Sequence, residues 1–148
     1  MRDIDRRLLE VREKLELYRS LIRRRAEVQR QLQEAEERYH TLREQLRREE
    51  ADVERLERFT LTAILAGLQG TREELLQKEK RESAAAKLKF DAAAQTVRAL
   101  RHELDRLERL ITRTQAVEEQ YAELLDEKER RIRDRGDALS EELAQKLE

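Results

Sequence analysis

Two short motifs in this chain have the residue types and spacing that chemistry uses. Glu37 and His40 form a Glu-x-x-His motif, the spacing found in the diiron carboxylate bundles. Those sites need a second copy of the motif and two further inward-facing glutamates, but His102 has Ala99 at the corresponding position. The sequence therefore predicts no metal site.

The second motif is Gly-Leu-Gln-Gly at residues 67–70. It has the outline of the GXXG loop with which KH domains clamp a nucleic acid backbone, but that domain also needs a sheet, and no strand pattern is visible. The sequence also shows no glycine-rich phosphate loop, serine elbow or paired carboxylate cleft. We therefore expect a protein that is not an enzyme, with no catalytic residue and no cofactor.

Arginines are locally in excess in two segments. Residues 18–33 carry five arginines against one acidic side chain, and residues 98–113 carry five against three, so their charges add up to +6. If the two segments lie side by side, they form a basic belt for phosphates or an acidic partner. The candidate contacts are Arg23, Arg24, Arg25 and Arg106. Because the belt lacks interleaved aromatic residues, a solvated helical face is the favoured interpretation, and nucleic-acid or acidic-partner binding is the alternative function.

The composition predicts long helices packed side by side. Charged residues make up 45% of the 148 positions, aromatic residues make up 3%, and proline and cysteine are absent. Acidic and basic side chains nearly cancel, 34 against 33, so no global field attracts nucleic acid or a membrane. No apolar run fits a signal peptide or a membrane span. We therefore expect a cytoplasmic protein.

The apolar residues recur at alternating steps of four and three along most of the chain. This spacing holds over residues 28–56 and is typical of a coiled-coil seam. The series over residues 4–22 meets it out of phase near Arg25, as a three-residue insertion would cause. A third series follows over residues 76–132. The pattern predicts two long segments that each present one apolar stripe.

The sequence between these segments predicts a turn. Gly67 and Gly70 favour the left-handed conformation that ends a helix, and Thr71 with Glu74 forms a capping box that begins the next one. Thr60 or Thr62 is expected to cap a short helix before the glycines. If the chain folds back at residues 65–66, the numbers of two residues that face each other across the hairpin add up to about 131.

The expected fold is all-α: a long antiparallel two-helix coiled-coil hairpin with a short helical turn region and a short C-terminal helix. We expect the first arm at about residues 2–58, the turn at 59–71 and the second arm at about 72–135. Gly136 is expected to end the second arm, so that a tail helix covers residues 137–148.

Apolar residues in excess of one stripe per arm predict contact surfaces, because exposed apolar patches usually mark association sites. At the tip of the hairpin these are Leu61, Ile64, Leu65 and Leu68. Along the arms they are Leu21, Leu110 and Val117. We therefore expect a homo-oligomer, such as a dimer of hairpins, or a complex with another protein, and a structural or adaptor role.

The stretches LERFTLTAILAGLQGTREELLQKEKRE and AAKLKFDAAAQTVRALRHELDRLE resemble a group of uncharacterised bacterial coiled-coil proteins. In that group a similar Leu-Thr and Gly-Thr turn joins two long charged helices. The second helix carries an Ala-x-Leu-Lys-aromatic-Asp segment, which here occupies residues 86–91. The resemblance covers about residues 50–110 and implies a helical hairpin with no assigned activity.

Overall fold

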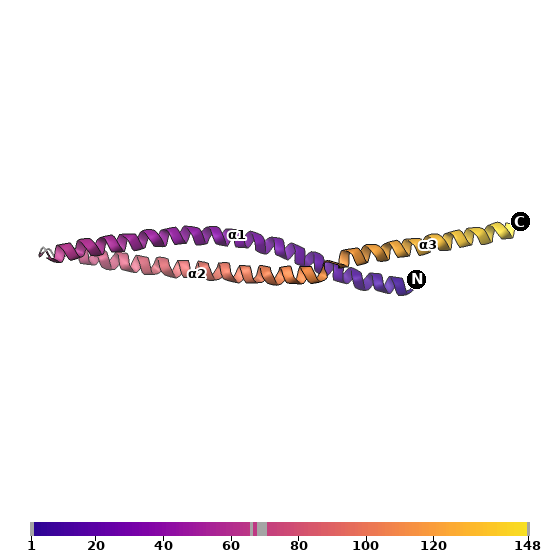
Figure 1. Cartoon of the computed structure of the whole chain (residues 1–148), viewed down its shortest axis with the longest axis horizontal. Coiled ribbons are helices and arrows are strands. Elements are labelled where there is room, and N and C mark those ends of the chain that lie inside the picture. The colour runs from indigo at the N-terminus through magenta and orange to yellow at the C-terminus, as the bar shows by residue number, and fades with distance from the viewer. Residues whose placement is uncertain (1, 66, 68–70, 148) are drawn as a thin grey trace. The chain divides into compact units, whose positions relative to one another are not determined.

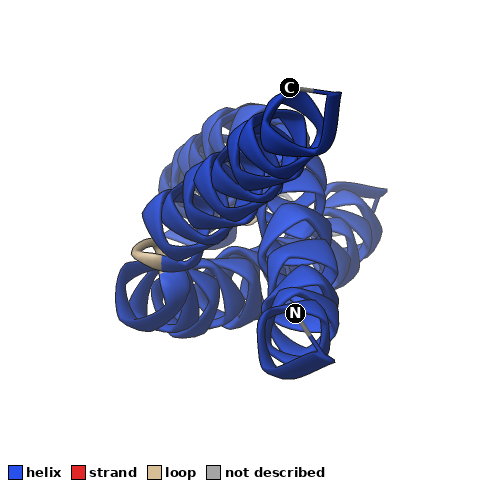
Figure 2. Cartoon of the chain, turned by 90° about the vertical axis from the view of Figure 1, so that its right-hand side faces the viewer, coloured by secondary structure: helices blue, strands red, loops and turns tan. Residues whose placement is uncertain are grey.

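The computed structural model describes residues 2–65, 67 and 71–147, except for the side chain of Thr71 (Figure 1). They form three helices: α1 (Arg2–Leu65), α2 (Thr71–Thr114) and α3 (Val117–Leu147). The part of the chain that is described contains helices and short connections but no strand (Figure 2). The predicted all-α class is confirmed.

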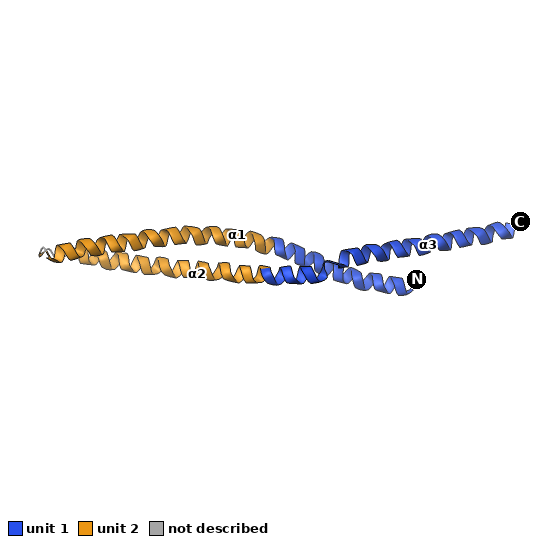
Figure 3. Ribbon diagram, in the orientation of Figure 1, with its two compact units in different colours: residues 1–26, 105–148 blue, residues 27–104 orange. Residues whose placement is uncertain are grey.

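Contacts within the chain divide it into two compact units (Figure 3). Residues 27–104 form the first, which we call the hairpin unit. Residues 1–26 and 105–148 form the second, which we call the terminal unit. In the first arm the boundary falls next to Arg25, where the apolar pattern shifts phase.

In the hairpin unit α1 and α2 run antiparallel. Side-chain contacts between them include Tyr39 with Phe90 at 5.1 Å between ring centroids, Glu57 with Lys80 at 3.5 Å, and Glu36 with Arg101 at 3.1 Å. The residue numbers of these pairs add up to 129, 137 and 137, close to the expected sum. The prediction that the chain folds back on itself between these helices is confirmed.

Buried side chains of the hairpin unit lie on the predicted apolar stripe at Val28 of α1 and at Leu76, Ala86, Ala93 and Val97 of α2. Thr60 and Ala63 are also buried and extend the inner face of α1 past residue 56, where the stripe was expected to end. Alanines at buried positions of α2 leave room for larger side chains from α1, so the two backbones can approach closely. Because each helix contributes a single stripe, the rest of its surface stays exposed and is mostly polar.

The terminal unit pairs the first turns of α1 with the end of α2 and with α3. Its buried side chains are Ile4 and Leu15 from α1, Leu107 and Ile111 from α2, and Val117 from α3. An ion pair of 2.7 Å between Asp5 Oδ1 and Lys128 Nζ joins α1 to α3. Hydrogen bonding to Lys128 is the main cause that lowers the pKa of Asp5, although desolvation opposes it.

The structure corrects the expected short helix before the turn. Residues 59–65 continue α1 without a break, so neither threonine there begins a new helix. The hydroxyl of Thr62 donates a hydrogen bond of 2.9 Å to the carbonyl oxygen of Arg58, one turn earlier. A threonine whose hydroxyl is satisfied in this way remains inside a helix instead of capping the next one.

Gly67 lies in the left-handed region, with φ of 75°, and its N–H donates a 3.0 Å hydrogen bond to the carbonyl oxygen of Ile64. The prediction that Gly67 supplies a helix-ending conformation is confirmed. Gly70 and the side chain of Thr71 lie outside the described residues, so the proposed capping box stays a prediction. Thr71 itself is the first residue of α2.

The second arm, expected to be continuous over residues 72–135, contains a break. α2 ends at Thr114 and α3 begins at Val117. The Thr114 hydroxyl donates to the Leu110 carbonyl oxygen at 2.8 Å. Glu118 and Glu119 occupy the first turn of α3, where negative charge favours a helix N-terminus. The polar residue Thr114 on the apolar stripe, followed by Glu118 and Glu119, is the feature of the sequence that indicates this break.

Gly136 does not end a helix, and the predicted tail helix beginning at residue 137 is wrong as a separate element. α3 runs through Gly136 to Leu147. A glycine inside a helix costs only about 1 kcal/mol relative to alanine, which the surrounding good helix formers offset. Its presence alone was therefore a weak stop signal.

Candidate interaction surfaces

The end of α1 carries an exposed apolar patch. Leu61, Ile64 and Leu65 have 62%, 47% and 87% of their surface exposed. Their spacing of three and four residues places them on one face of the helix. We call these three residues the tip patch. Leu68, the fourth residue predicted at the tip, lies outside the described residues.

The tip patch is separate from the face that α1 uses within the hairpin unit. Thr60 and Ala63 are 7% and 3% exposed and form that inner face. Phe59 and Leu75 add exposed apolar surface in the neighbouring turns of α1 and α2, at 55% and 49%. Residues 59–66 contain no charged side chain. The end of the hairpin unit therefore offers apolar surface that no described residue of its own unit covers.

The lateral residues predicted along the arms are less accessible. Val117 is only 7% exposed, so it is not available to a partner in this unit. Leu21 and Leu110 are both half-buried in the terminal unit. The predicted lateral surface is therefore smaller than expected. Val117 packs in the interior at the start of α3, and only part of the Leu21 and Leu110 side chains is exposed.

The arginine segments are divided between the two units, and in the hairpin unit Arg30 and Arg101 form ion pairs. Arg30 pairs with Glu27 at 2.6 Å and with Glu34 at 2.8 Å, and Arg101 pairs with Glu36 at 3.1 Å. The hydrogen bonds that Arg30 donates to Glu27, then the negative charges of Glu27 and Glu34, raise the pKa of Arg30. These pairs neutralise part of the excess positive charge.

The four arginines proposed as contacts all belong to the terminal unit. Arg23 and Arg24 are exposed, Arg25 is half-buried, and Arg106 is exposed but interacts within the chain. Three consecutive helical residues point in directions about 100° apart, so residues 23–25 do not converge on one point. Nucleic-acid binding through these residues stays a prediction.

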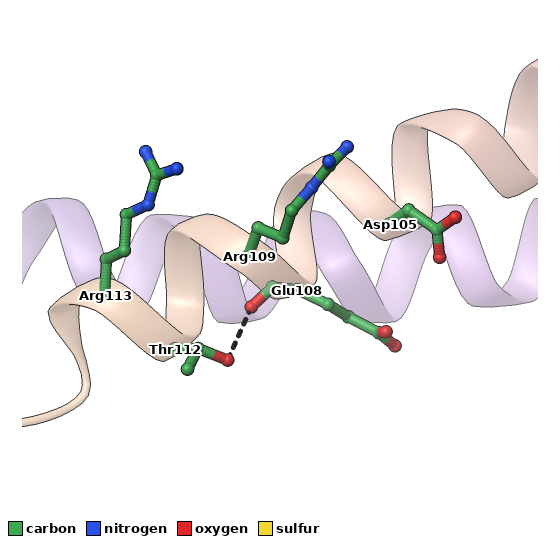
Figure 4. A pocket seen from close by; sticks show the side chains of 5 residues that line it. All are labelled: Asp105, Glu108, Arg109, Thr112 and Arg113. Atoms are coloured by element: carbon green, nitrogen blue, oxygen red, sulfur yellow. Dashed lines mark hydrogen bonds between the residues drawn. The ribbon is translucent and has the colours of Figure 1, made fainter.

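A shallow depression lies on α2 in the terminal unit (Figure 4). Its lining residues all come from this one helix: Asp105, Glu108, Arg109, Thr112 and Arg113. The Thr112 hydroxyl donates to the Glu108 carbonyl oxygen at 2.9 Å, so it satisfies the backbone of its own helix. A single helix cannot surround a ligand, and the depression lacks the concave shape that small-molecule sites use.

An acidic cluster joins α1 and α2 in the hairpin unit. Carboxylate oxygens of Glu49, Glu79 and Glu82 lie within 4.8 Å of one another. Partial burial raises the pKa of Glu79, and the negative charges of Glu82, Glu49 and Asp52 raise it further. Carboxylates are ligands of hard cations, but acidic clusters of this kind also occur without an ion. Glu49 and Glu79 occupy positions on the four-and-three spacing of the sequence, whereas their approach to Glu82 is seen only in the structure.

The histidine of the Glu-x-x-His motif has a structural neighbour. His40 is exposed, and its ring lies edge-on to that of Tyr39 with 5.4 Å between centroids. Within the described residues, no group of three potential ligands includes His40.

Comparisons of the chain with family models, with curated proteins and with solved structures find no match. In the described part of the chain, no helix combines the length and the apolar character that crossing a membrane requires. The interaction surfaces are therefore argued from their own residues.

Proposed function

We propose that this chain is a structural or adaptor protein without enzymatic activity, a coiled-coil hairpin that associates with a second copy of itself through the tip patch. The observation that carries the proposal is the exposure of Leu61, Ile64 and Leu65 on one helical face. Three neighbouring apolar side chains add no hydrophobic stabilisation while they face water, and such patches usually mark a surface that a partner covers.

A second copy suits this surface because the patch is apolar and uncharged. Residues 59–66 contain no acidic or basic side chain, so two copies that meet there bring no like charges together. An uncharged apolar surface is self-complementary, as the contact of a two-fold dimer must be. Phe59 and Leu75 lie close enough along their helices to widen the contact.

The test replaces Ile64 and Leu65 with serine and measures the mass of the full chain by light scattering over a range of concentrations. We expect the wild type to associate and the Ile64→Ser/Leu65→Ser variant to lose the part of this association that involves the tip. Helicity measured by circular dichroism is expected to stay the same, because both side chains are exposed.

The matched control is Leu88→Ser. Leu88 is 72% exposed on α2 in the same unit, but it has no exposed large apolar residue at three or four positions from it. It should leave the mass unchanged. Equal masses for the wild type and the Ile64→Ser/Leu65→Ser variant at every concentration would rule out self-association through the tip.

A further inference from the structure

The last part of α3 is an exposed helix. Lys128 still contacts α1 through its ion pair with Asp5 at 2.7 Å. From Glu129 to Leu147 every side chain is exposed. Most of the stability of helices in proteins comes from tertiary packing, and this segment packs on no described residue of its own unit. We call residues 129–147 the tail.

The tail carries an apolar stripe. Ile132, Leu139, Leu143 and Leu147 are 51%, 57%, 60% and 86% exposed. Steps of seven, four and four residues confine the four side chains to a sector of about 80° on one helical face. Gly136 lies on the same face, and a Cβ added there would meet no atom within 4 Å. Gly136 therefore leaves a space in the stripe between the side chains of Ile132 and Leu139.

The charges of the tail are separated along its length. Residues 130–135 contain four arginines and one aspartate, a net charge of +3. Residues 137–147 contain one aspartate, two glutamates and one lysine, a net charge of −2. Two parallel tails would place like charges together, whereas two antiparallel tails place each basic half beside an acidic half.

We propose that the tail is a second self-association surface, on which two copies of this chain pair antiparallel through the stripe. In a register that matches both the stripe and the charges, the numbers of opposed residues add up to 275. Ile132 then faces the second copy's Leu143, and Arg133 faces the second copy's Glu142. Leu139 faces the second copy's Gly136, where the missing side chain makes room for it.

This surface does not depend on the tip patch, so the two proposals can fail separately. The experiment therefore uses the full chain carrying Ile64→Ser/Leu65→Ser, in which the proposed tip contact is removed. Its mass by sedimentation is expected to reach twice 17.8 kDa as the concentration rises. A chain that stays monomeric at all concentrations in this background would overturn the tail proposal.

Charge variants in the same background test the antiparallel register without removing helix-forming residues. Arg133→Glu/Arg135→Glu makes both halves of the tail acidic and should raise the dissociation constant roughly tenfold or more, because like charges then face each other. Adding Glu141→Arg/Glu142→Arg restores opposite charges and should restore the dimer. Lys87→Glu/Lys89→Glu, with the same change in charge on exposed positions of α2, is the matched control and should leave the dimer intact.

Single spin labels then decide the orientation. In an antiparallel pair, labels on Ser140 of both copies lie close together, whereas labels on Glu129 are separated by about 25 Å along the helix axis. A parallel pair would bring both sets of labels close together and would overturn the proposal. Failure of the second pair of charge changes to restore the dimer would also overturn it. Leu139→Ser/Leu143→Ser should abolish the dimer, and persistence of the dimer in that variant would exclude the stripe as the contact.

Discussion

The ring of Tyr39 on α1 lies on the ring of Phe90 on α2, with centroids 5.1 Å apart and planes tilted by 33°. The two residues are far apart in the sequence and meet because α1 and α2 run antiparallel in the hairpin unit. Both rings are half-buried and lie on the predicted stripe. The expected sum of 131 would place Tyr39 opposite Ala92, two residues from Phe90, so the aromatic pair is an addition from the structure.

Phe90→Ala should destabilise the hairpin unit by about 1 to 3 kcal/mol, less than a fully buried phenylalanine would cost. Tyr39→Leu should cost less. In a double-mutant cycle the two changes should show a coupling of about 0.5 to 1.5 kcal/mol, since each removes the same ring contact. Urea denaturation followed by circular dichroism measures these values. Strictly additive effects would show that the rings do not stabilise each other.

Thr60→Val should stabilise the hairpin unit. The Thr60 side chain is 7% exposed, and its hydroxyl has no hydrogen-bond partner among the described residues. Replacing an unsatisfied buried hydroxyl by a methyl group of similar shape is expected to gain about 1 kcal/mol. The measurement is the midpoint of thermal unfolding. Thr62→Val is the control, because the exposed Thr62 hydroxyl already bonds to Arg58, and a gain of the same size there would contradict this explanation.

Alanine should have opposite effects at Gly67 and Gly136. Gly67 has a φ of 75°, so a side chain there strains the backbone and should cost about 1 kcal/mol. Gly136 is helical with nothing within 4 Å of an added Cβ, so alanine should favour the helix by about 1 kcal/mol. Denaturation at a concentration low enough to keep the chain monomeric checks both signs. A loss of helix stability in Gly136→Ala would contradict the helical assignment at that residue.

The stability of the hairpin unit should depend on pH through Glu79. Partial burial and the charges of Glu82, Glu49 and Asp52 raise the pKa of Glu79 from its ordinary value of 4.5. The folded state therefore binds a proton more readily than the unfolded chain, and stability falls as pH rises from 4.5 through the raised pKa. Glu79→Gln should stabilise the protein at neutral pH, and its advantage should shrink below pH 4.5.

Glu50→Gln is the control for this pH dependence, since Glu50 is exposed and adjoins the cluster residue Glu49 on α1. It should leave the pH profile of unfolding close to that of the wild type. An advantage of Glu79→Gln that stays constant from neutral to acidic pH would show that the glutamine acts through packing and not through lost charge.

The fold-back of α1 and α2 predicts a short distance within one molecule. Labels on Arg43 and Lys89, which are both exposed, should lie about 10 to 20 Å apart when the label arms are included. A continuous helix would separate the same positions by about 70 Å. Dilution of labelled chains with an excess of unlabelled chains keeps the measurement intramolecular. A distance near the longer value would contradict the hairpin.

The helical class, the seam and the antiparallel register follow from the sequence alone. Apolar residues at steps of four and three can be buried together only on one face of a helix, and Gly67 permits the conformation that reverses the chain. These are local properties of the chain. The pairing of Asp5 with Lys128 and of Glu36 with Arg101 agrees with the register that they predict.

Only the tertiary structure decided where the helices begin and end and which apolar residues remain exposed. Three residues, Thr60, Thr62 and Gly136, fit both a helix boundary and a helix interior. The packing of the surrounding residues decides which of the two they occupy. Val117 is buried and Leu65 is exposed although both are apolar, because burial depends on what the opposite helix presents at that level. The local sequence specifies the stripe, whereas the shape and extent of the surface that covers it are properties of the folded chain.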